Sequence, residues 1–129
     1  MMNKQQALHA FWSSFGWPAI DEQSAYDEQT LDQMDIDYPL ISYEVATDEF
    51  GASVAIGANL VDRTTSWAAL EQEANEIYER ISRGGIMVPY DDGAIWITRG
   101  SPFSQRISPD AKSGILQIHI NINAEYLSA

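Results

Sequence analysis

Cysteine is absent from the 129-residue sequence. Its absence excludes disulfide bonds, thiolate metal sites and cysteine-dependent catalysis, and it fits a reducing compartment. Long apolar runs are absent too, because no segment approaches the roughly 18 uninterrupted apolar residues of a membrane span. Residues 1–8 contain Lys4 but no apolar run, so we expect no signal peptide and a soluble protein made in the cytoplasm.

Basic residues are scarce, since 7 Lys and Arg face 19 Asp and Glu and the formal net charge is −12. Binding to DNA without sequence preference depends on Lys and Arg that neutralise phosphates. A chain this acidic is therefore a poor candidate to grip DNA. The charge leaves three interpretations open: it keeps the protein soluble, it repels DNA, or it imitates DNA.

Apolar residues make up 45% of the sequence, which is typical of a folded protein. The length fits a single domain over residues 1–129, with an N-terminal helix over 3–15, an acidic loop over 17–37 and an α/β body over 38–128. Gly16 and Pro18 end the first helix. Apolar residues at helical spacing predict that helix: Leu8, Phe11, Trp12 and Phe15.

The acidic loop is most acidic over residues 21–37, which hold seven acids and no basic residue. Loops of this length inside a compact domain are usually functional or disordered. We interpret this stretch as a surface loop that faces solvent or a partner.

Two strands are predicted over 38–47 and 53–63, joined by a turn over 48–52. A helix follows from Trp67 to Ile81, with N-cap oxygens in residues 64–66 and a C-cap at Gly84 or Gly85. We expect the acids of this helix to cover its exposed face: Glu71, Glu73, Glu76 and Glu79.

Three further strands are predicted over 86–90, 94–100 and the C-terminal stretch 116–126. Residues 100–113 contain Pro102 and Pro109, and we expect a loop there that could order on assembly. The resulting order, α-β-β-α-β-β-β, predicts an α+β fold with a small, mostly antiparallel sheet and two helices packed on one face.

The last strand alternates between apolar and polar residues. Successive side chains of a strand point to opposite faces, so one face needs a core while the other is polar and nearly uncharged. The polar row consists of Gln117, His119, Asn121 and Asn123. Whether this row meets water or another protein stays open at this point.

Sites for chemistry are hard to find in this sequence. His9 and His119 are its two histidines, and neither has metal-ligand spacing with another His. Asp91-Asp92-Gly93 lacks the remaining oxygens of a calcium loop, and no phosphate-binding loop or nucleophile elbow occurs. We therefore predict no catalytic, cofactor-binding or metal-binding residue and no enzyme activity.

Four residues around one turn suggest a subunit or partner interface: Trp96, Arg99, Phe103 and Arg106. Trp and Arg are enriched among the residues that dominate binding energy at interfaces. The alternative is that Trp96 and Phe103 are ordinary core residues.

The order of several stretches resembles the tail terminator (tail completion) proteins, minor tail proteins of long-tailed bacteriophages. The resemblance covers about residues 35–128. The stretches are "YPLISYEV", "ANLVDRTTSW", "ALEQEANEIYERI" followed by "GG", "DDGAIWITRGSPFSQRI" and "LQIHININAEYL". The acidic stretch 21–37 is a departure that matches no feature of that family.

The resemblance implies a structural protein of the virion, at the junction of tail and neck. Such proteins form a ring, commonly a hexamer, on the head-proximal end of the tail tube. The ring stops tube polymerisation and offers a surface to the head–tail connector protein, and DNA later passes through it without specific binding. The implied partners are further copies of the chain, the tail tube protein and the connector, and no cofactor is implied.

In such a ring, the row Gln117, His119, Asn121 and Asn123 would line the lumen or meet a neighbour. It is too uncharged to hold phosphates. Three rival interpretations are a head-closure or neck adaptor protein, an acidic DNA-mimic inhibitor, and an enzyme using His119 or the acids. An exposed sheet face in a monomer is the simplest alternative.

Overall fold

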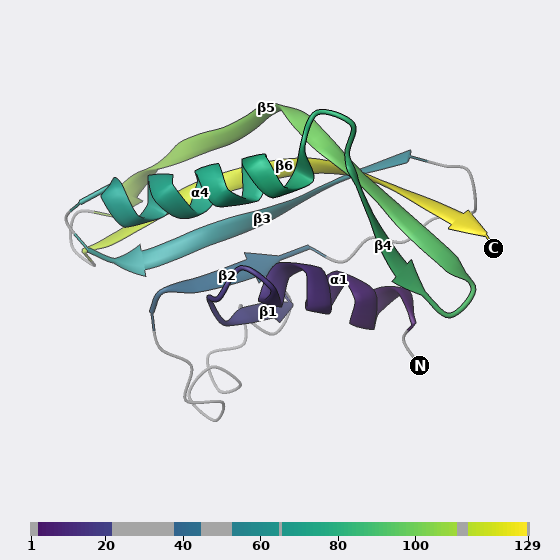
Figure 1. Cartoon of the computed structure of the whole chain (residues 1–129). Helices are drawn as coiled ribbons and strands as arrows, with labels where there is room; N and C mark the ends of the chain where they lie inside the picture. Colours follow the sequence, from purple (N-terminus) through teal and green to yellow (C-terminus); the bar gives the residue numbers. More distant parts are fainter. Residues whose placement is uncertain (1–2, 22–37, 45–52, 65, 111–113, 129) are drawn as a thin grey trace.

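The computed structural model describes residues 3–21, 38–44, 53–64, 66–110 and 114–128. They form an α+β fold in which two helices accompany a curled, six-stranded mixed sheet (Figure 1). The helices are α1 (Lys4–Ser13) and α4 (Ala68–Ile81). The strands are β1 (Ala19–Asp21), β2 (Leu40–Tyr43), β3 (Ser53–Arg63), β4 (Ile86–Tyr90), β5 (Gly93–Asp110) and β6 (Ile115–Ser128).

The sheet has the strand order β1-β2-β3-β6-β5-β4. β1 pairs with β2 in parallel, and every other neighbouring pair is antiparallel. β6 is a central strand, since it pairs with β3 along 11 residues and with β5 on its other side. The even-numbered residues of β6 from Leu116 to Tyr126 are buried. The alternation in its sequence is therefore an alternation between the core and the opposite face of the sheet.

Helix α1 begins with a capping box. The Asn3 side chain accepts a hydrogen bond from the Gln6 amide at 2.8 Å, and the Gln6 side chain accepts one from the Asn3 amide at 2.9 Å. Two of the amides that a helix start leaves without partners are thereby satisfied. The apolar side of the helix is buried: Ala7, Leu8, Phe11 and Trp12. Their side chains share one core with residues of α4 and of the sheet.

The N-cap of helix α4 is Trp67, which makes no side-chain capping hydrogen bond, so the predicted N-cap oxygen in residues 64–66 is wrong. Ser66 Oγ, one residue earlier, nevertheless accepts a hydrogen bond from the Ala68 amide at 3.2 Å. The C-terminal end of the helix also differs from the prediction. Ser82, not a glycine, follows the helix with a positive φ of 62°, and Gly85 takes a positive φ three residues later. The Ser82 hydroxyl donates to the Gly85 carbonyl at 3.2 Å, which stabilises this turn locally.

One feature of the predicted order α-β-β-α-β-β-β is wrong. Residues 19–21 form strand β1 although they were placed in the acidic loop 17–37, and β1 makes the sheet mixed. Three residues are too few for any periodicity, so only tertiary pairing with β2 reveals this strand. Of the strand predicted over 38–47, residues Leu40–Tyr43 form β2, and residues 45–47 lie outside the described residues. Residues 22–37 and the turn at 48–52 lie outside the described residues.

The predicted loop at 100–113 is the other correction, because β5 continues to Asp110. Its pairing with β6 shifts register between Arg99 and Ser104 and again between Ile107 and Asp110. Pro102 and Pro109 fall inside these two irregularities. A proline without an N–H is tolerated at such a bulge, so the two prolines distort the strand without ending it.

Candidate functional site

The polar row of β6 lies on the face of the sheet opposite the core. All four of its members, Gln117, His119, Asn121 and Asn123, are half-buried. Directly opposed residues of antiparallel strands point to the same face. The row is therefore flanked by the following residues of β3 and β5: Ala55, Gly57, Asn59, Val61, Thr98, Gln105 and Ile107.

Hydrogen bonds hold part of this row in place. His119 Nδ1 lies 2.8 Å from Asn59 Oδ1, across the β3–β6 pair. Asn121 Nδ2 donates to the Pro102 carbonyl at 3.0 Å, which ties the row to the irregular part of β5. The His119 ring lies over Gly57, where an added Cβ would come within 2.7 Å of the ring. Glycine at position 57 thus provides the space that the imidazole occupies.

This outer face of the sheet carries little charge. On β3 and β6 its charged residues are Arg63 and Glu125, which lie far apart along the strands. The residues of β3 and β6 between them on this face are uncharged, but the Glu44 carboxylate, just after β2, accepts a hydrogen bond from the Gly57 amide at 3.2 Å. The Arg63 guanidinium lies 5.2 Å from the centre of the Tyr38 ring. The sheet face therefore contrasts with the net charge of −12 of the whole chain.

Trp96 lies on the same outer face and is not a core residue. Its side chain is 39% exposed, next to the cross-strand residue Met87, which is 52% exposed. The Trp96 indole Nε1–H donates to the Gly84 carbonyl at 3.1 Å. Trp96 and Met87 form an exposed apolar corner of the sheet, and the other cross-strand neighbour of Trp96 is the charged Glu125 at the end of the polar row.

The other three residues predicted for the interface face helix α4 instead. Arg99 donates from Nε and Nη2 to the Tyr78 carbonyl, at 2.9 and 2.6 Å. The Phe103 ring meets the Tyr78 ring edge-on with centroids 5.2 Å apart. The structure therefore separates Trp96 from the rest of the predicted group.

Arg106 is also engaged within the chain. Its Nε lies 2.8 Å from Glu71 Oε1, and its guanidinium lies over the Trp67 ring. Both partners of this ion pair are about half exposed, so the pair is screened by solvent and contributes little to stability. Arg106 nevertheless fixes the second half of β5 against the start of α4.

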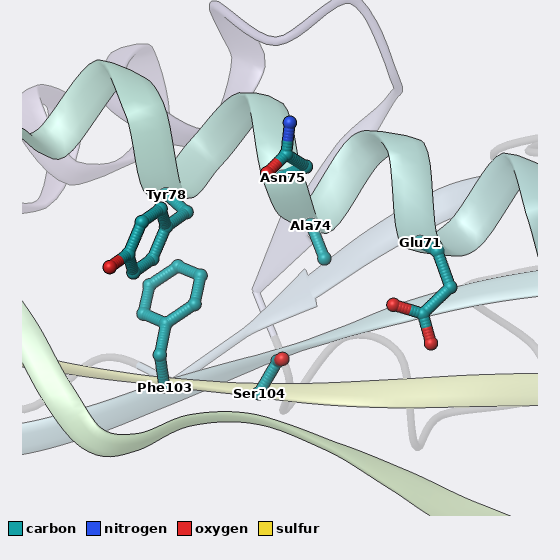
Figure 2. Close-up of a pocket in the computed structure, with 6 residues that line it drawn as sticks. All are labelled: Glu71, Ala74, Asn75, Tyr78, Phe103 and Ser104. Atoms are coloured by element: carbon teal, nitrogen blue, oxygen red, sulfur yellow. The ribbon is translucent and has the colours of Figure 1, made fainter.

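A groove lies between α4 and β5, with a volume of about 360 Å³ (Figure 2). The rings of Tyr78 and Phe103 stand at one end and the Glu71 carboxylate at the other. The groove is lined by Glu71, Ala74, Asn75, Tyr78, Phe103 and Ser104. The prediction had included Phe103 alone among these residues. The periodicity of α4 identified its buried stripe but could not show that β5 would lie beside it.

The described residues offer little that resembles a catalytic site. His9 lies 3.0 Å from the Tyr43 hydroxyl and 3.3 Å from Ser13 Oγ, whereas His119 contacts Asn59. Within the described ranges, no three His, Cys, Asp or Glu residues are placed to hold a metal ion. No helix in the same ranges is long and apolar enough to cross a membrane.

Glu73 is the titratable residue that the sequence analysis placed wrongly. It was expected on the exposed face of α4, but it is 6% exposed, beside the buried Ala74 and Ile77. Its Oε1 has no hydrogen-bond partner. Burial raises the pKa of Glu73 from 4.5 to about 7; Glu76 adds to this rise and Arg80 opposes it. Helical spacing marks position 73 as inward-facing, three residues after Leu70, but the residue type argued for the surface.

Comparison with known proteins gives no family for this chain. No family model matches it, and no curated protein matches it.

Proposed function

We propose that this protein is a structural subunit that assembles into a ring, in the manner of the phage tail terminators that its sequence resembles. The ring would cap the head-proximal end of a tail tube, stop its polymerisation and join it to the head–tail connector. The observation that carries the proposal is the outer face of the sheet, whose central row is uncharged on a chain of net charge −12.

Charge makes this face unusual. Copies of a protein with net charge −12 repel one another, so they associate best through surfaces that lack acidic residues. Charged residues are also depleted at the centres of protein interfaces. The polar row of β6 meets both conditions, because Gln117, His119, Asn121 and Asn123 are polar without a formal charge.

The same face suits a lumen through which DNA passes. A Lys or Arg that contacts a phosphate releases counterions and strengthens binding, which would retard passing DNA. The polar row has no such residue, and its amides and imidazole are partly held by Asn59 and Pro102. DNA would therefore pass along a hydrated surface that does not bind its phosphates.

The experiment that tests the proposal is native mass measurement across a protein concentration series, with and without purified tail tubes. We expect a closed oligomer, or a ring that forms only when tube ends are present, because a weak contact between subunits gains from multivalency. A chain that stays monomeric at every concentration and does not bind tail tubes would refute the proposal. Binding to a connector but not to tubes would favour the neck adaptor.

A further inference from the structure

The open edge of β5 is the strongest remaining feature of the molecule. β4 pairs with β5 only from Gly93 to Ile97, so β5 continues past the end of its neighbour. Along 98–110 it has β6 on one side and, within the described part of the sheet, no strand on the other. Figure 1 shows this part of β5 running along the rim of the sheet.

Sheet edges in natural proteins are usually protected, because their free N–H and C=O groups can pair with another chain. The other edge strands of the described sheet are protected in this way. β1 has three residues, and β4 has five, one of which is Pro89. The edge of β5 is longer, and no proline interrupts it over 103–108, where every second N–H group points away from β6.

The groove between α4 and β5 runs beside this edge (Figure 2). A strand that adds to an exposed edge uses main-chain hydrogen bonds for affinity and places alternate side chains in neighbouring pockets. Phe103 and Ser104 belong both to the edge strand and to the groove lining. The apolar end of the groove, formed by Tyr78 and Phe103, is suited to one apolar side chain of the added segment.

The charge of this region indicates the occupant. Residues 93–109 contain no acid and two arginines, Arg99 and Arg106, in a chain with 19 acids and 7 basic residues. Arg106 pairs with Glu71, whereas Arg99 donates to the uncharged Tyr78 carbonyl. The edge strand is therefore less acidic than the chain as a whole, and an acidic protein is repelled least there. A second copy of this chain, with net charge −12, is such a protein.

We propose that the open edge of β5, with the adjoining α4 groove, is the site where an extended segment of a second copy adds to the sheet. This inference rests on the proposed ring and specifies its subunit contact. The contact is heterologous, since the edge of one copy meets a different surface of the next, and such contacts generate rings when the rotation closes. The polar row of β6 is then left for the lumen.

The test uses the full chain, assembled at high concentration or on tail tube ends, and two nearly isosteric charge variants. Gln105→Glu adds an acid on the edge strand, and Asn75→Asp adds one at the groove. Each is expected to weaken assembly by about tenfold, because the acid repels an acidic partner. Gln72→Glu, at an exposed position of α4 that does not line the groove, is the matched control and should assemble like the wild type.

Hydrogen exchange adds a readout that a side-chain contact would not change. Strand addition should slow amide exchange within 103–108 by about tenfold or more on assembly, because free edge amides become hydrogen-bonded. If the wild type assembles while these amides exchange at their free rate and both variants assemble normally, the edge proposal is overturned and the ring stands. If the wild type never assembles, the ring itself is overturned and the edge proposal falls with it.

Discussion

The two faces of the sheet differ although their residues alternate along the same strands. On β6, Ile118, Ile120 and Ile122 are each at most 1% exposed and join the core shared with both helices. Their neighbours Gln117, His119 and Asn121 face the other way and are half-buried. The residues of the inner face are packed in the core, so substitutions there change the free energy of unfolding. The polar row of β6 does not belong to this core, so the lack of charge in the row calls for another explanation.

Charged residues sharpen the contrast. On the helix-covered side, Arg99 bonds a carbonyl of α4, Arg106 pairs with Glu71, and Arg80 Nη1 donates to the Ser14 carbonyl at the end of α1. The guanidinium groups there hold elements together. The centre of the outer face carries no charged residue on β3 or β6. We infer that charge on one side serves the fold and that its absence on the other serves a contact or a channel.

The largest expected effect comes from truncating one side chain on each face of β6. Ile120→Ala should lower the free energy of unfolding by about 2 to 5 kcal/mol, because it removes buried methylene groups and leaves a cavity. Gln117→Ala, three residues away on the outer face, should change it by less than about 0.5 kcal/mol. Urea unfolding of both variants measures the difference. Equal losses would mean that the outer face is as tightly packed as the core.

A buried carboxyl on the helix-covered side gives the second prediction. The pKa of Glu73 rises from 4.5 to about 7 on folding, so the native state holds this proton more tightly than the unfolded chain. The carboxyl therefore lowers stability progressively as the pH rises from about 4.5 to about 7. Glu73→Gln should be more stable than the wild type by about 1 to 3 kcal/mol at pH 8, and by much less at pH 5.

Urea midpoints at pH 5, 6, 7 and 8 measure this effect. Taking the difference between variant and wild type at each pH cancels the titration of the other acids, provided that they do not couple to position 73. The exposed Glu79→Gln is the matched control and should differ little from wild type throughout. A Glu73→Gln difference that stays constant with pH would show that the carboxyl is not held protonated.

Much of the α+β fold could be predicted from local patterns. The alternation of β6, the bounds of β3 and the apolar stripe of α4 are written in consecutive residues, where periodicity is decisive. The two strand segments that local patterns did not predict depend on pairing with strands distant in the sequence. β1 forms because Ala19, Ile20 and Asp21 pair with β2. β5 continues to Asp110 because it pairs with β6 on both sides of two irregularities.

The candidate site was harder to predict than the fold. Trp96, Arg99, Phe103 and Arg106 are close in sequence, and closeness suggested one surface. A strand divides its neighbours between two faces, and the register shift after Arg99 changes which residues go to which face. No pattern in the sequence reports such a shift. The polar row of β6, in contrast, lies within one strand that runs without interruption.

The smallest effects are expected from the arginines that join α4 to β5, and they separate a role in folding from a role in contacts. Arg99→Met should lower the free energy of unfolding by about 1 to 2 kcal/mol, because it removes two charge-assisted hydrogen bonds to the Tyr78 carbonyl. This carbonyl lies near the C-terminal end of α4, where the helix dipole attracts positive charge. Arg106→Met removes an exposed ion pair and should lower it by less than about 1 kcal/mol. Urea unfolding at low and high salt distinguishes the two, since salt screens the exposed Arg106 pair more than the hydrogen bonds of Arg99.

If Arg106→Met impairs assembly while stability stays unchanged, Arg106 acts at the β5 edge between copies. If Arg99→Met alone destabilises the monomer, its guanidinium belongs to the fold, and the helix-covered side keeps its charges for internal use.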